Sequence, residues 1–557
     1  MSAADRNRRV SIVTGGGGGI GAAIAMELGR RGDHVVTVDP LVSVDGTEVL
    51  PAPTETTAGR IVAAGGSAQA SNTSVTDAGA MAALAAELMS THRRIDAVVN
   101  VAGITRPTGF AKGEESDWSA VLSVHLDGYR NVLDAVLPHM AAAGRGHVVG
   151  VTSGSGWRAA DAGAYSCAKR AVAALTWQLG RSAPDGVAIN AISPIAMTRM
   201  VTAALGRSRP PAPGGGNPTA PRRSSATGGL SLGSMPEPEQ LAPLGAALAG
   251  HGAARLRGQV LFAGGSEVAV VDPPRLLEVV RTSDVRSVDV VVAGLLDALV
   301  AAEAAQATSG GANPRFGALY GPTDEPDAGA PAAVDTSAAV AVVSDRPDLA
   351  AEVTAALDAH GSLTTVVTSS ATAGFDDARA ALGAAAISLG GLDAVVVALR
   401  CPTKAVGTDD WAAVLGDHAG LTELIHADAA WARAAAEHAA ATERPLRLVT
   451  VTDAAGPGGR SRAQAAAQLA RSSLGATGGA VGAYSVAVET DGHHDTTAGL
   501  VGALASSPGA AGLSGAELVV GAGWFGLRSH PRPAGSIVVG GPGLPDWFDT
   551  ILEEQCR

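Results

Sequence analysis

Short apolar runs of strand length alternate with longer Ala-rich stretches along the first part of the chain. The strand-like runs are residues 10–14, 35–39, 97–102, 147–152 and 188–192. The helix-like stretches between them are residues 22–31, 78–91, 118–143 and 165–181. Strands that are apolar almost throughout are typical of a sheet buried on both faces. The alternation therefore predicts an α/β fold, a parallel sheet covered by helices on both sides.

The second half of the chain repeats features of the first half in the same order. The matching positions are 95–100 and 392–397, 147–152 and 447–452, Trp118 and Trp411, and His125 and His418. Each Trp precedes its His by seven residues. We infer the duplication of one α/β unit, which predicts two tandem Rossmann-like, doubly wound parallel-sheet domains.

Two Pro/Gly-rich stretches interrupt the pattern. The first, residues 206–236, precedes a strand at 259–262 that the first sheet still needs, so we expect an insertion within the first domain. The second marks a linker at 306–334. The predicted domains are therefore residues 1–305 and 335–557.

Composition and charge narrow the function. The chain has 557 residues and a net charge of -13, which disfavours nucleic acid as a partner. Its three cysteines, Cys167, Cys401 and Cys556, are far apart, so we expect free thiols in a reducing cytoplasm and no metal site. No apolar run reaches the roughly 18 residues of a membrane helix, and the polar N-terminus lacks a signal peptide.

A glycine-rich turn, Thr14 to Gly21, follows the first strand and opens a helix. Glycines at such a turn let the backbone approach a pyrophosphate, and the helix N-terminus supplies free N–H groups. The turn predicts dinucleotide binding, with Thr14, Gly15, Gly19, Ile20 and Gly21 at the cofactor.

Asp39 ends the second strand, 18 residues after Gly21. A carboxylate at this point accepts hydrogen bonds from the adenosine ribose and repels the 2′-phosphate of NADP. We therefore predict NAD as the cofactor. The alternative role of Asp39 is to start the loop before Pro40.

Tyr165 and Lys169 lie four residues apart at the start of a helix, so their side chains share a face. Ser153 lies 12 residues before Tyr165, just past a strand. An ammonium lowers the pKa of a neighbouring phenol, which can then accept the proton of an alcohol. Taken alone, such a pair is usually an ordinary helix surface.

These motifs occur together. They are the glycine turn, Asn100-Val101-Ala102-Gly103, Ser153, Tyr165-x-x-x-Lys169 and Pro194-Ile195-Ala196-Met197-Thr198. In this order and spacing, the chain resembles the short-chain dehydrogenase/reductase family over about residues 8–283.

The resemblance implies roles for these residues. Tyr165 would be the general acid/base and Ser153 would bind the substrate oxygen. Lys169 would hold the nicotinamide ribose and lower the pKa of Tyr165. The expected cofactor site also takes in Asn100, Ala102, Gly103, Ser74, Val75, Ile195 and Thr198. Among these, Val75 would contact the adenine and Thr198 the nicotinamide amide.

Three positions depart from the family pattern. His125 replaces the Asn that anchors a proton-relay water, and an imidazole either relays protons there or is structural. Ser74 replaces an Asp, which weakens the expected adenine contact. Ile195 replaces a Gly. With Ile195 and the segment 198–200, this motif is similar to that of the 3-hydroxyacyl-CoA dehydrogenase domains of multifunctional β-oxidation enzymes. The family position of 206–236 suggests a flexible lid over the substrate.

The second half lacks this chemistry. Its first strand is followed by Asp345 and no glycine turn, and Gln464-x-x-x-Gln468 stands in place of the Tyr and Lys. Glutamine cannot act as an acid. We therefore expect a degenerate, non-catalytic copy. Since family members pair through the Trp118 and Tyr165 segments, we expect it to form an internal pseudo-dimer with the first half, and a further homodimer stays open.

Three functions are compatible with these features. The leading one is an NAD-dependent enzyme that interconverts a secondary alcohol and its ketone. The second is an NADP-dependent ketoreductase of 3-oxoacyl thioesters, against which Asp39 argues. The third is a nucleotide-sensing scaffold without activity, which fits the second half but not the intact Ser153, Tyr165 and Lys169 of the first.

Overall fold

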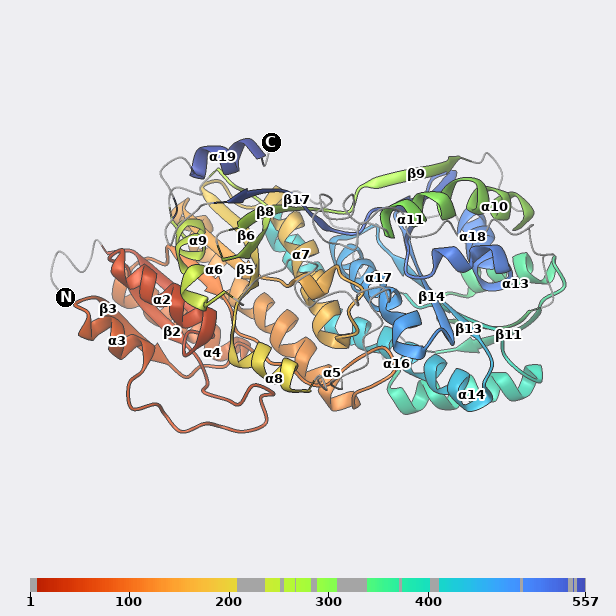
Figure 1. Cartoon of the computed structure of the whole chain (residues 1–557), viewed down its shortest axis with the longest axis horizontal. Helices are drawn as coiled ribbons and strands as arrows, with labels where there is room; N and C mark the ends of the chain where they lie inside the picture. The colour runs from red at the N-terminus through yellow and green to blue at the C-terminus, as the bar shows by residue number, and fades with distance from the viewer. Residues whose placement is uncertain are drawn as a thin grey trace, which may run out of the picture.

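Two mostly parallel sheets form the framework of the molecule (Figure 1). The computed structural model describes residues 8–207, 236–250, 255–265, 267–281, 288–307, 338–369, 373–400, 410–490, 494–538, 544 and 548–555. Each sheet carries helices on both faces, so the predicted α/β fold with two Rossmann-like units is confirmed.

The first sheet has the order β17-β8-β7-β6-β5-β4-β1-β2-β3 among the described residues. Its strands are β1 (Val10–Thr14), β2 (His34–Val38), β3 (Ser67–Ser71), β4 (Ala97–Asn100), β5 (Gly146–Val151), β6 (Val187–Ile195), β7 (Val260–Gly264), β8 (Glu267–Asp272) and β17 (Arg532–Val538). The strands from β3 to β7 pair in parallel, and β8 and β17 continue the sheet in antiparallel fashion. The order reverses at β1, between β2 and β4, where open α/β sheets form a crevice at the carboxyl ends of the strands.

The helices around this sheet begin and end close to the predicted stretches. They are α2 (Gly19–Arg30), α3 (Thr57–Ala63), α4 (Ala78–His92), α5 (Glu115–Leu122), α6 (Gly128–Ala143), α7 (Gly163–Ser182), α8 (Arg199–Arg207), α9 (Ala242–Leu248) and α19 (Phe548–Gln555), with short turns η2 (Gly154–Gly156) and η3 (Pro238–Gln240). The stretch predicted as one helix over 118–143 contains a π-helical turn, η1 (Ser123–Asp127), between α5 and α6. Such π turns are frequent at functional sites, and this one carries His125.

The second sheet has the order β11-β10-β12-β13-β14-β15-β16-β9. Its strands are β9 (Leu276–Arg281), β10 (Ala339–Ser344), β11 (Leu363–Thr368), β12 (Ala394–Ala398), β13 (Leu446–Asp453), β14 (Val481–Val488), β15 (Glu517–Gly521) and β16 (Trp524–Arg528). Its helices are α10 (Val288–Gly294), α11 (Val300–Ala307), α13 (Pro347–Asp358), α14 (Phe375–Leu389), α15 (Trp411–Asp417), α16 (Leu421–Thr442), α17 (Pro457–Thr477) and α18 (His494–Ser506), with η5 (Leu295–Leu299) and η6 (Pro508–Leu513). The parallel order β11-β10-β12-β13-β14-β15 matches the order β2-β1-β4-β5-β6-β7 of the first sheet, as the repeat predicts.

The predicted domain boundaries differ from the structure, because the two sheets exchange strands. β9 lies before residue 305, yet it pairs with β16 of the second sheet. β17 lies near the end of the chain, yet it pairs with β8 of the first sheet. The segment from α10 to α11 also packs into the core of the second half, through Val288, Val291 and Leu295. Figure 1 shows β9 and α10 over the second half and β17 beside β8.

The two halves pack through helices, α7 against α17 above all. One hydrophobic core runs across this interface and includes Trp118 and Val172 of the first half and Trp431, Ala465 and Leu469 of the second. Many of the buried residues of both helices are alanine or glycine, which lets the two backbones approach closely and suits a chain with few aromatic residues.

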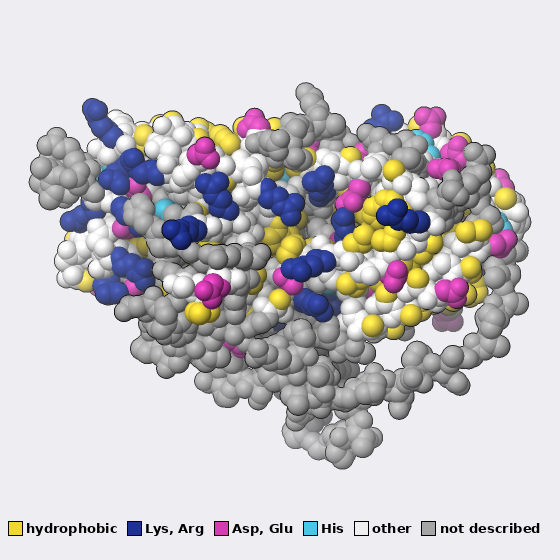
Figure 2. All heavy atoms as spheres, turned by 90° about the horizontal axis from the view of Figure 1, so that it is seen from above, with side chains coloured by type: hydrophobic (Ala, Val, Ile, Leu, Met, Phe, Trp, Pro, Cys, Tyr) yellow, Lys and Arg dark blue, Asp and Glu magenta, His cyan; other side chains and the backbone are white. Residues whose placement is uncertain are grey.

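One face of the second half carries exposed hydrophobic side chains. From above, hydrophobic side chains gather over the second half, on the side where β9 and α10 lie (Figure 2). Leu276 and Leu277 of β9, Val290 of α10 and Leu296 of the adjoining η5 are exposed. None of the helices that the structure describes is long and apolar enough to cross a membrane.

Candidate active site

The glycine turn joins β1 to α2 with very little space for side chains. Gly15 and Gly19 have φ angles of +64° and +51°, which favour glycine. A Cβ atom at Gly16 would lie 2.7 Å from the carbonyl oxygen of Val13, and one at Gly21 would collide with the carbonyl oxygen of Gly15. The turn therefore needs glycines to bring strand and helix this close.

The rim of this turn suits a pyrophosphate. The residue before the helix, Gly18, gives no side-chain cap, and the first N–H groups of a helix have no partner within it. A Cβ atom at Gly18 would lie 3.6 Å from the nearest heavy atom, Nη2 of Arg199. A Cβ atom at Gly19 would lie 3.5 Å from the side chain of Thr198. Free N–H groups, open space and a cation thus meet at one point, so the residues present fit a dinucleotide phosphate.

Asp39 lies at the end of β2 and faces the same turn. Its carboxylate accepts hydrogen bonds from the N–H groups of Gly17, at 2.9 Å, and Leu41, at 2.9 Å. These two bonds fix the carboxylate and leave acceptor capacity for ribose hydroxyls. The sequence-predicted Asp39 is therefore beside the glycine turn.

The end of β4 closes the other side of the crevice. The hydroxyl of Thr14 donates to Oδ1 of Asn100 at 2.8 Å and accepts from the N–H of Ala102 at 3.2 Å. A Cβ at Gly103 would collide with the His125 ring. The predicted Asn100, Ala102 and Gly103 thus connect the glycine turn to the His125 side of the crevice.

Ser153, Tyr165 and Lys169 come together at the end of β5 and the start of α7. The Ser153 hydroxyl is close enough to the Tyr165 hydroxyl to influence its pKa, and the Lys169 ammonium lies 5.6 Å from the centre of the Tyr165 ring. Lys169 is buried and donates to the carbonyl oxygen of Val151 at 2.7 Å. The Ser153 hydroxyl also accepts from that of Ser155 at 3.1 Å. All three predicted residues are therefore in one cluster.

The protonation of this cluster differs from the sequence expectation. Burial raises the pKa of Tyr165, and the hydrogen bond from Ser153 opposes that rise in part. The pKa of Tyr165 is thus raised, whereas we expected Lys169 to lower it. Burial also lowers the pKa of Lys169 to about 7. A lysine that is half neutral near pH 7 is a weak source of positive charge.

His125 lies edge-on to Tyr165, with 5.1 Å between ring centres. Its Nε2 is 2.8 Å from the carbonyl oxygen of Ile104, so Nε2 carries the proton and Nδ1 has the lone pair. Among the described residues, Nδ1 has no hydrogen-bond partner. Burial, with a smaller effect of Lys169, lowers the pKa of His125 well below 6.5. His125 is therefore a neutral acceptor near Tyr165.

The remaining predicted residues lie around the crevice with less definite roles. Val75 is buried against Gly128 and its carbonyl accepts from Asn131, whereas the hydroxyl of Ser74 pairs with that of Thr76. Ile195 ends β6, three residues before Thr198. Thr198 accepts from the N–H of Val201 at the start of α8, so its side chain fixes that helix start over the glycine turn. Most of the predicted lid, residues 208–235, lies outside the described residues.

The comparisons with known proteins point to one family. The family model of the short chain dehydrogenases matches residues 9–209. The short-chain reductase NovJ of Streptomyces niveus is 36% identical over 33% of this chain and 68% of its own length. The acetoacetyl-CoA reductase of Allochromatium vinosum is 30% identical over 43% of this chain and 91% of its own length. The chain belongs to the short-chain dehydrogenase family.

One more relative and one solved structure are also similar to this short-chain dehydrogenase. The peroxisomal hydratase-dehydrogenase-epimerase of Saccharomyces cerevisiae is 31% identical over 34% of this chain but only 21% of its own length. The N-domain of a bacterial malonyl-CoA reductase, solved with NADP, matches 90% of this chain and 96% of its own with a TM-score of 0.62 and 16% identity. The latter similarity shows that the whole two-sheet fold has a known counterpart.

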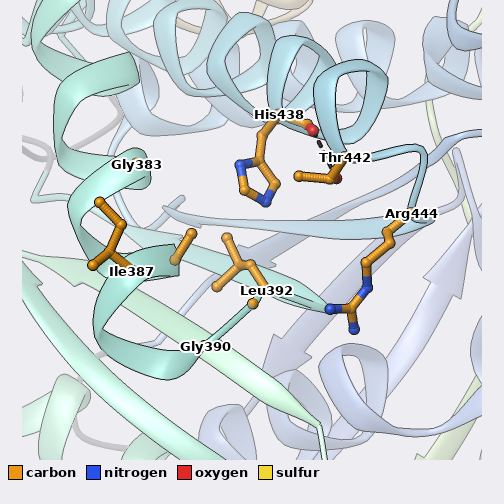
Figure 3. Close-up of a pocket in the computed structure, with 9 residues that line it drawn as sticks. Gly383, Ile387, Gly390, Leu392, His438, Thr442 and Arg444 are labelled. Atoms are coloured by element: carbon orange, nitrogen blue, oxygen red, sulfur yellow. Dashed lines mark hydrogen bonds between the residues drawn. The ribbon is translucent and has the colours of Figure 1, made fainter.

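The second half of this short-chain dehydrogenase has a different arrangement at the corresponding positions. Oδ1 of Asp345, in the turn after β10, accepts from the N–H of Arg400 at 2.6 Å. Gln464 and Gln468 are buried in α17 and face the first half. A pocket in this half lies between the ends of α14 and α16, where Ile387, Leu392 and Arg444 surround it (Figure 3). Its lining residues lie within 383–444, so it is not part of the Tyr165 cluster.

Two groups of residues around the candidate site were not predicted from the sequence. The first is Arg199, which follows Thr198 and lies over the glycine turn. Gln468 and Arg471 contact the loop after Ser153 from the other half of the chain. The sequence shows that α17 has Gln464 and Gln468 in place of the Tyr and Lys of the first half. No local pattern in the sequence indicates what these glutamines bind.

Proposed function

We propose that the first half of the chain is an NAD-dependent oxidoreductase that interconverts a secondary alcohol and its ketone. The observation that supports this most directly is the cluster of Ser153 and Tyr165 next to buried Lys169, whose ammonium lies 5.6 Å from the centre of the Tyr165 ring. The pair lies at the carboxyl end of β5, and the glycine turn lies at the carboxyl end of β1 in the same parallel sheet. Nucleotide and substrate would therefore meet at one edge of the sheet.

In this proposal each side chain has a separate task. The Ser153 hydroxyl holds the substrate oxygen. Tyr165 takes the alcohol proton as a phenolate, or gives its own proton to the ketone oxygen as a phenol. Lys169 is anchored by the carbonyl of Val151 and keeps its remaining donors for the nicotinamide ribose. Bound NAD supplies the hydride acceptor. His125 offers the lone pair of Nδ1 beside Tyr165, and a water there would donate a hydrogen bond to it.

The choice of NAD over NADP depends on Asp39. Two backbone N–H groups hold its carboxylate beside Gly17, where a Cβ would come within 2.6 Å of Oδ2. A second negative group in the same place would be repelled. Arg199, whose guanidinium lies over the turn, would instead face the pyrophosphate.

A second candidate is an NADP-dependent ketoreductase of 3-oxoacyl thioesters. The relative from Allochromatium vinosum, named an acetoacetyl-CoA reductase, favours this reaction class. The two candidates differ in cofactor and direction, and both use Ser153, Tyr165 and Lys169.

We further propose that the second half does not catalyse and forms an internal pseudo-dimer with the first. Asp345 occupies the turn where a pyrophosphate would bind, and two glutamines replace the acid/base pair. The packing of α7 on α17 supports the pseudo-dimer.

The test is a turnover screen with the full chain. Formation of reduced nicotinamide would be measured with 3-hydroxybutyryl-CoA, a steroid alcohol and cyclohexanol, each with NAD or NADP, and its consumption with acetoacetyl-CoA. We expect turnover with NAD in at least one case, and Tyr165→Phe should lower kcat about 10²- to 10⁴-fold while cofactor binding persists. Cofactor binding without turnover of any probe would favour the nucleotide-sensing scaffold instead.

A further inference from the structure

The loop that follows Ser153 is held from outside its own half. This loop, residues 153–158, contains the short turn η2 and carries the proposed substrate-binding hydroxyl. The Gln468 amide donates to the carbonyl oxygens of Ser155, at 3.0 Å, and Arg158, at 2.8 Å. Nη1 of Arg471 donates to the carbonyl oxygen of Trp157 at 2.6 Å. Three backbone acceptors in this loop are thus bound by one helix, α17 of the second half.

The direction of the Gln468 amide is fixed by a buried cluster on its other side. Nη1 of Arg170 donates to Oε1 of Gln468 at 3.3 Å. Because a guanidinium has donors only, Oε1 must face Arg170 and the NH₂ group must face the loop. The geometry therefore assigns the Gln468 donors to the two carbonyls.

Arg170 is itself locked in place, and it directly follows Lys169 in α7. It donates to Gln464 at 2.9 Å and to Glu517 at 2.5 Å, and Gln464 also donates to Glu517. Arg170 and Glu517 are almost completely buried, so removing either partner would leave an uncompensated charge. The cluster is therefore a rigid anchor between α7 and α17.

We propose that Gln468 of the second half is a positioning residue for the active site of the first half. It holds the Ser153 loop through two backbone carbonyls and thereby sets where the Ser153 hydroxyl meets Tyr165. The inference rests on the proposed function for its effect on turnover. Helix α17 lacks the acid/base pair. In this proposal its Gln468, which stands where α7 has Lys169, supports Tyr165 and Lys169 of the first half.

The experiment compares variants of the full chain. Gln468→Glu is nearly isosteric and keeps an acceptor for Arg170, but it places a carboxylate against two carbonyl oxygens. Gln468→Asn is milder, because it is one methylene shorter and stays neutral. Gln178→Leu is the matched control: Gln178 lies on α7 and donates to Ser461 across the same interface at 3.1 Å, without contact to the loop.

Two readouts are measured. Hydrogen exchange of the peptide 153–158 should be faster in Gln468→Glu and Gln468→Asn and unchanged in Gln178→Leu. With a substrate found in the screen, kcat of Gln468→Glu should fall about 10²-fold, since a displacement of about 1 Å has such an effect, and that of Gln468→Asn by less. The Kd for NAD should stay the same, because the glycine turn that would bind the pyrophosphate lies between β1 and α2 and is not part of the Ser153 loop.

The outcomes separate the two proposals. Unchanged loop exchange and kcat in Gln468→Asn would overturn the inference, and this variant decides if Gln468→Glu does not fold. An equal loss in Gln178→Leu would also overturn it, because a weakened interface would then explain the effect. If the wild type turns over no probe, the proposed function fails, and the exchange experiment still decides whether Gln468 holds the loop.

Discussion

At the scale of single residues, Asp39 has the most definite setting in the proposed cofactor site. Hydrogen bonds from the N–H groups of Gly17 and Leu41 keep its negative charge at a fixed point beside the glycine turn. A fixed charge discriminates better than a mobile one, because it cannot turn away from a second anion.

We therefore expect Asp39→Ala to raise the ratio of kcat/KM with NADP to that with NAD by about tenfold or more, equivalent to roughly 1.4 kcal/mol. Asp39→Asn is the matched control, because it keeps an oxygen for the Gly17 N–H and loses only the charge. It should shift the ratio in the same direction. An unchanged ratio in both variants would show that the carboxylate does not select the cofactor.

His125 gives a prediction about pH. Its pKa is lowered well below 6.5 by burial, so the imidazole stays neutral as the pH falls from about 7 to about 5.5. Wild type and His125→Asn should thus have the same shape of kcat/KM against pH in this range, whatever the difference in absolute rate. A titration step that disappears in His125→Asn would contradict a neutral acceptor.

The identity of the clustered residues could be predicted from the sequence, but their protonation could not. Ser153, Tyr165 and Lys169 are recognisable by spacing, because a strand end and one helix turn bring them together. The pKa values of Tyr165 and Lys169 depend on how deeply both are buried. That burial comes from distant segments of the chain, which no local pattern contains.

At the scale of elements, the contact between β1 and α2 allows a sharp test of the glycine turn. A Cβ at Gly21 would collide with the Gly15 carbonyl, whereas one at Gly18 would have 3.6 Å of space at an extended φ of -164°. We expect Gly21→Ala to lower the free energy of unfolding by about 1–3 kcal/mol and to weaken NAD binding, as overpacking does.

Gly18→Ala should change stability by less than about 0.5 kcal/mol, since it meets no backbone atom. Thermal melts and fluorescence titrations with NAD would measure both variants. Equal behaviour of the two variants would show that the turn tolerates a side chain at either place.

Most elements were predictable, and the exceptions have clear physical causes. Buried parallel strands are continuous apolar runs, so β1, β4, β5 and β6 stand out in the sequence. The π turn at Ser123–Asp127 was not predicted, because it differs from an α-helix only in the hydrogen-bond partner of a few residues. It interrupts the helix at the residue that faces Tyr165.

At the scale of the whole molecule, the duplication was visible in the sequence and the exchange of strands was not. β9 and β17 are both outer strands in antiparallel pairs. Either sheet could in principle accept them, since backbone hydrogen bonding does not depend on sequence. Which sheet receives which strand is decided by contacts between residues more than 200 positions apart, such as those of β16 with β9.

The exchange predicts that the two halves cannot be separated at the apparent linker. A chain ending at residue 305 would lack β17 on the edge of β8, would leave β9 and α10 without their sheet, and would expose the α7 face that packs on α17. That face belongs to a continuous core with Trp431 and Leu469, so its exposure costs far more than a surface change. We expect residues 1–305 alone to be insoluble or inactive, and co-expression with 306–557 to restore a soluble, active complex. As a control, an intact chain with a protease site placed within 308–337 should stay associated and active after cleavage, because the covalent link matters less than the shared sheets. A soluble, active fragment of residues 1–305 would show instead that the first half folds without strands from the second.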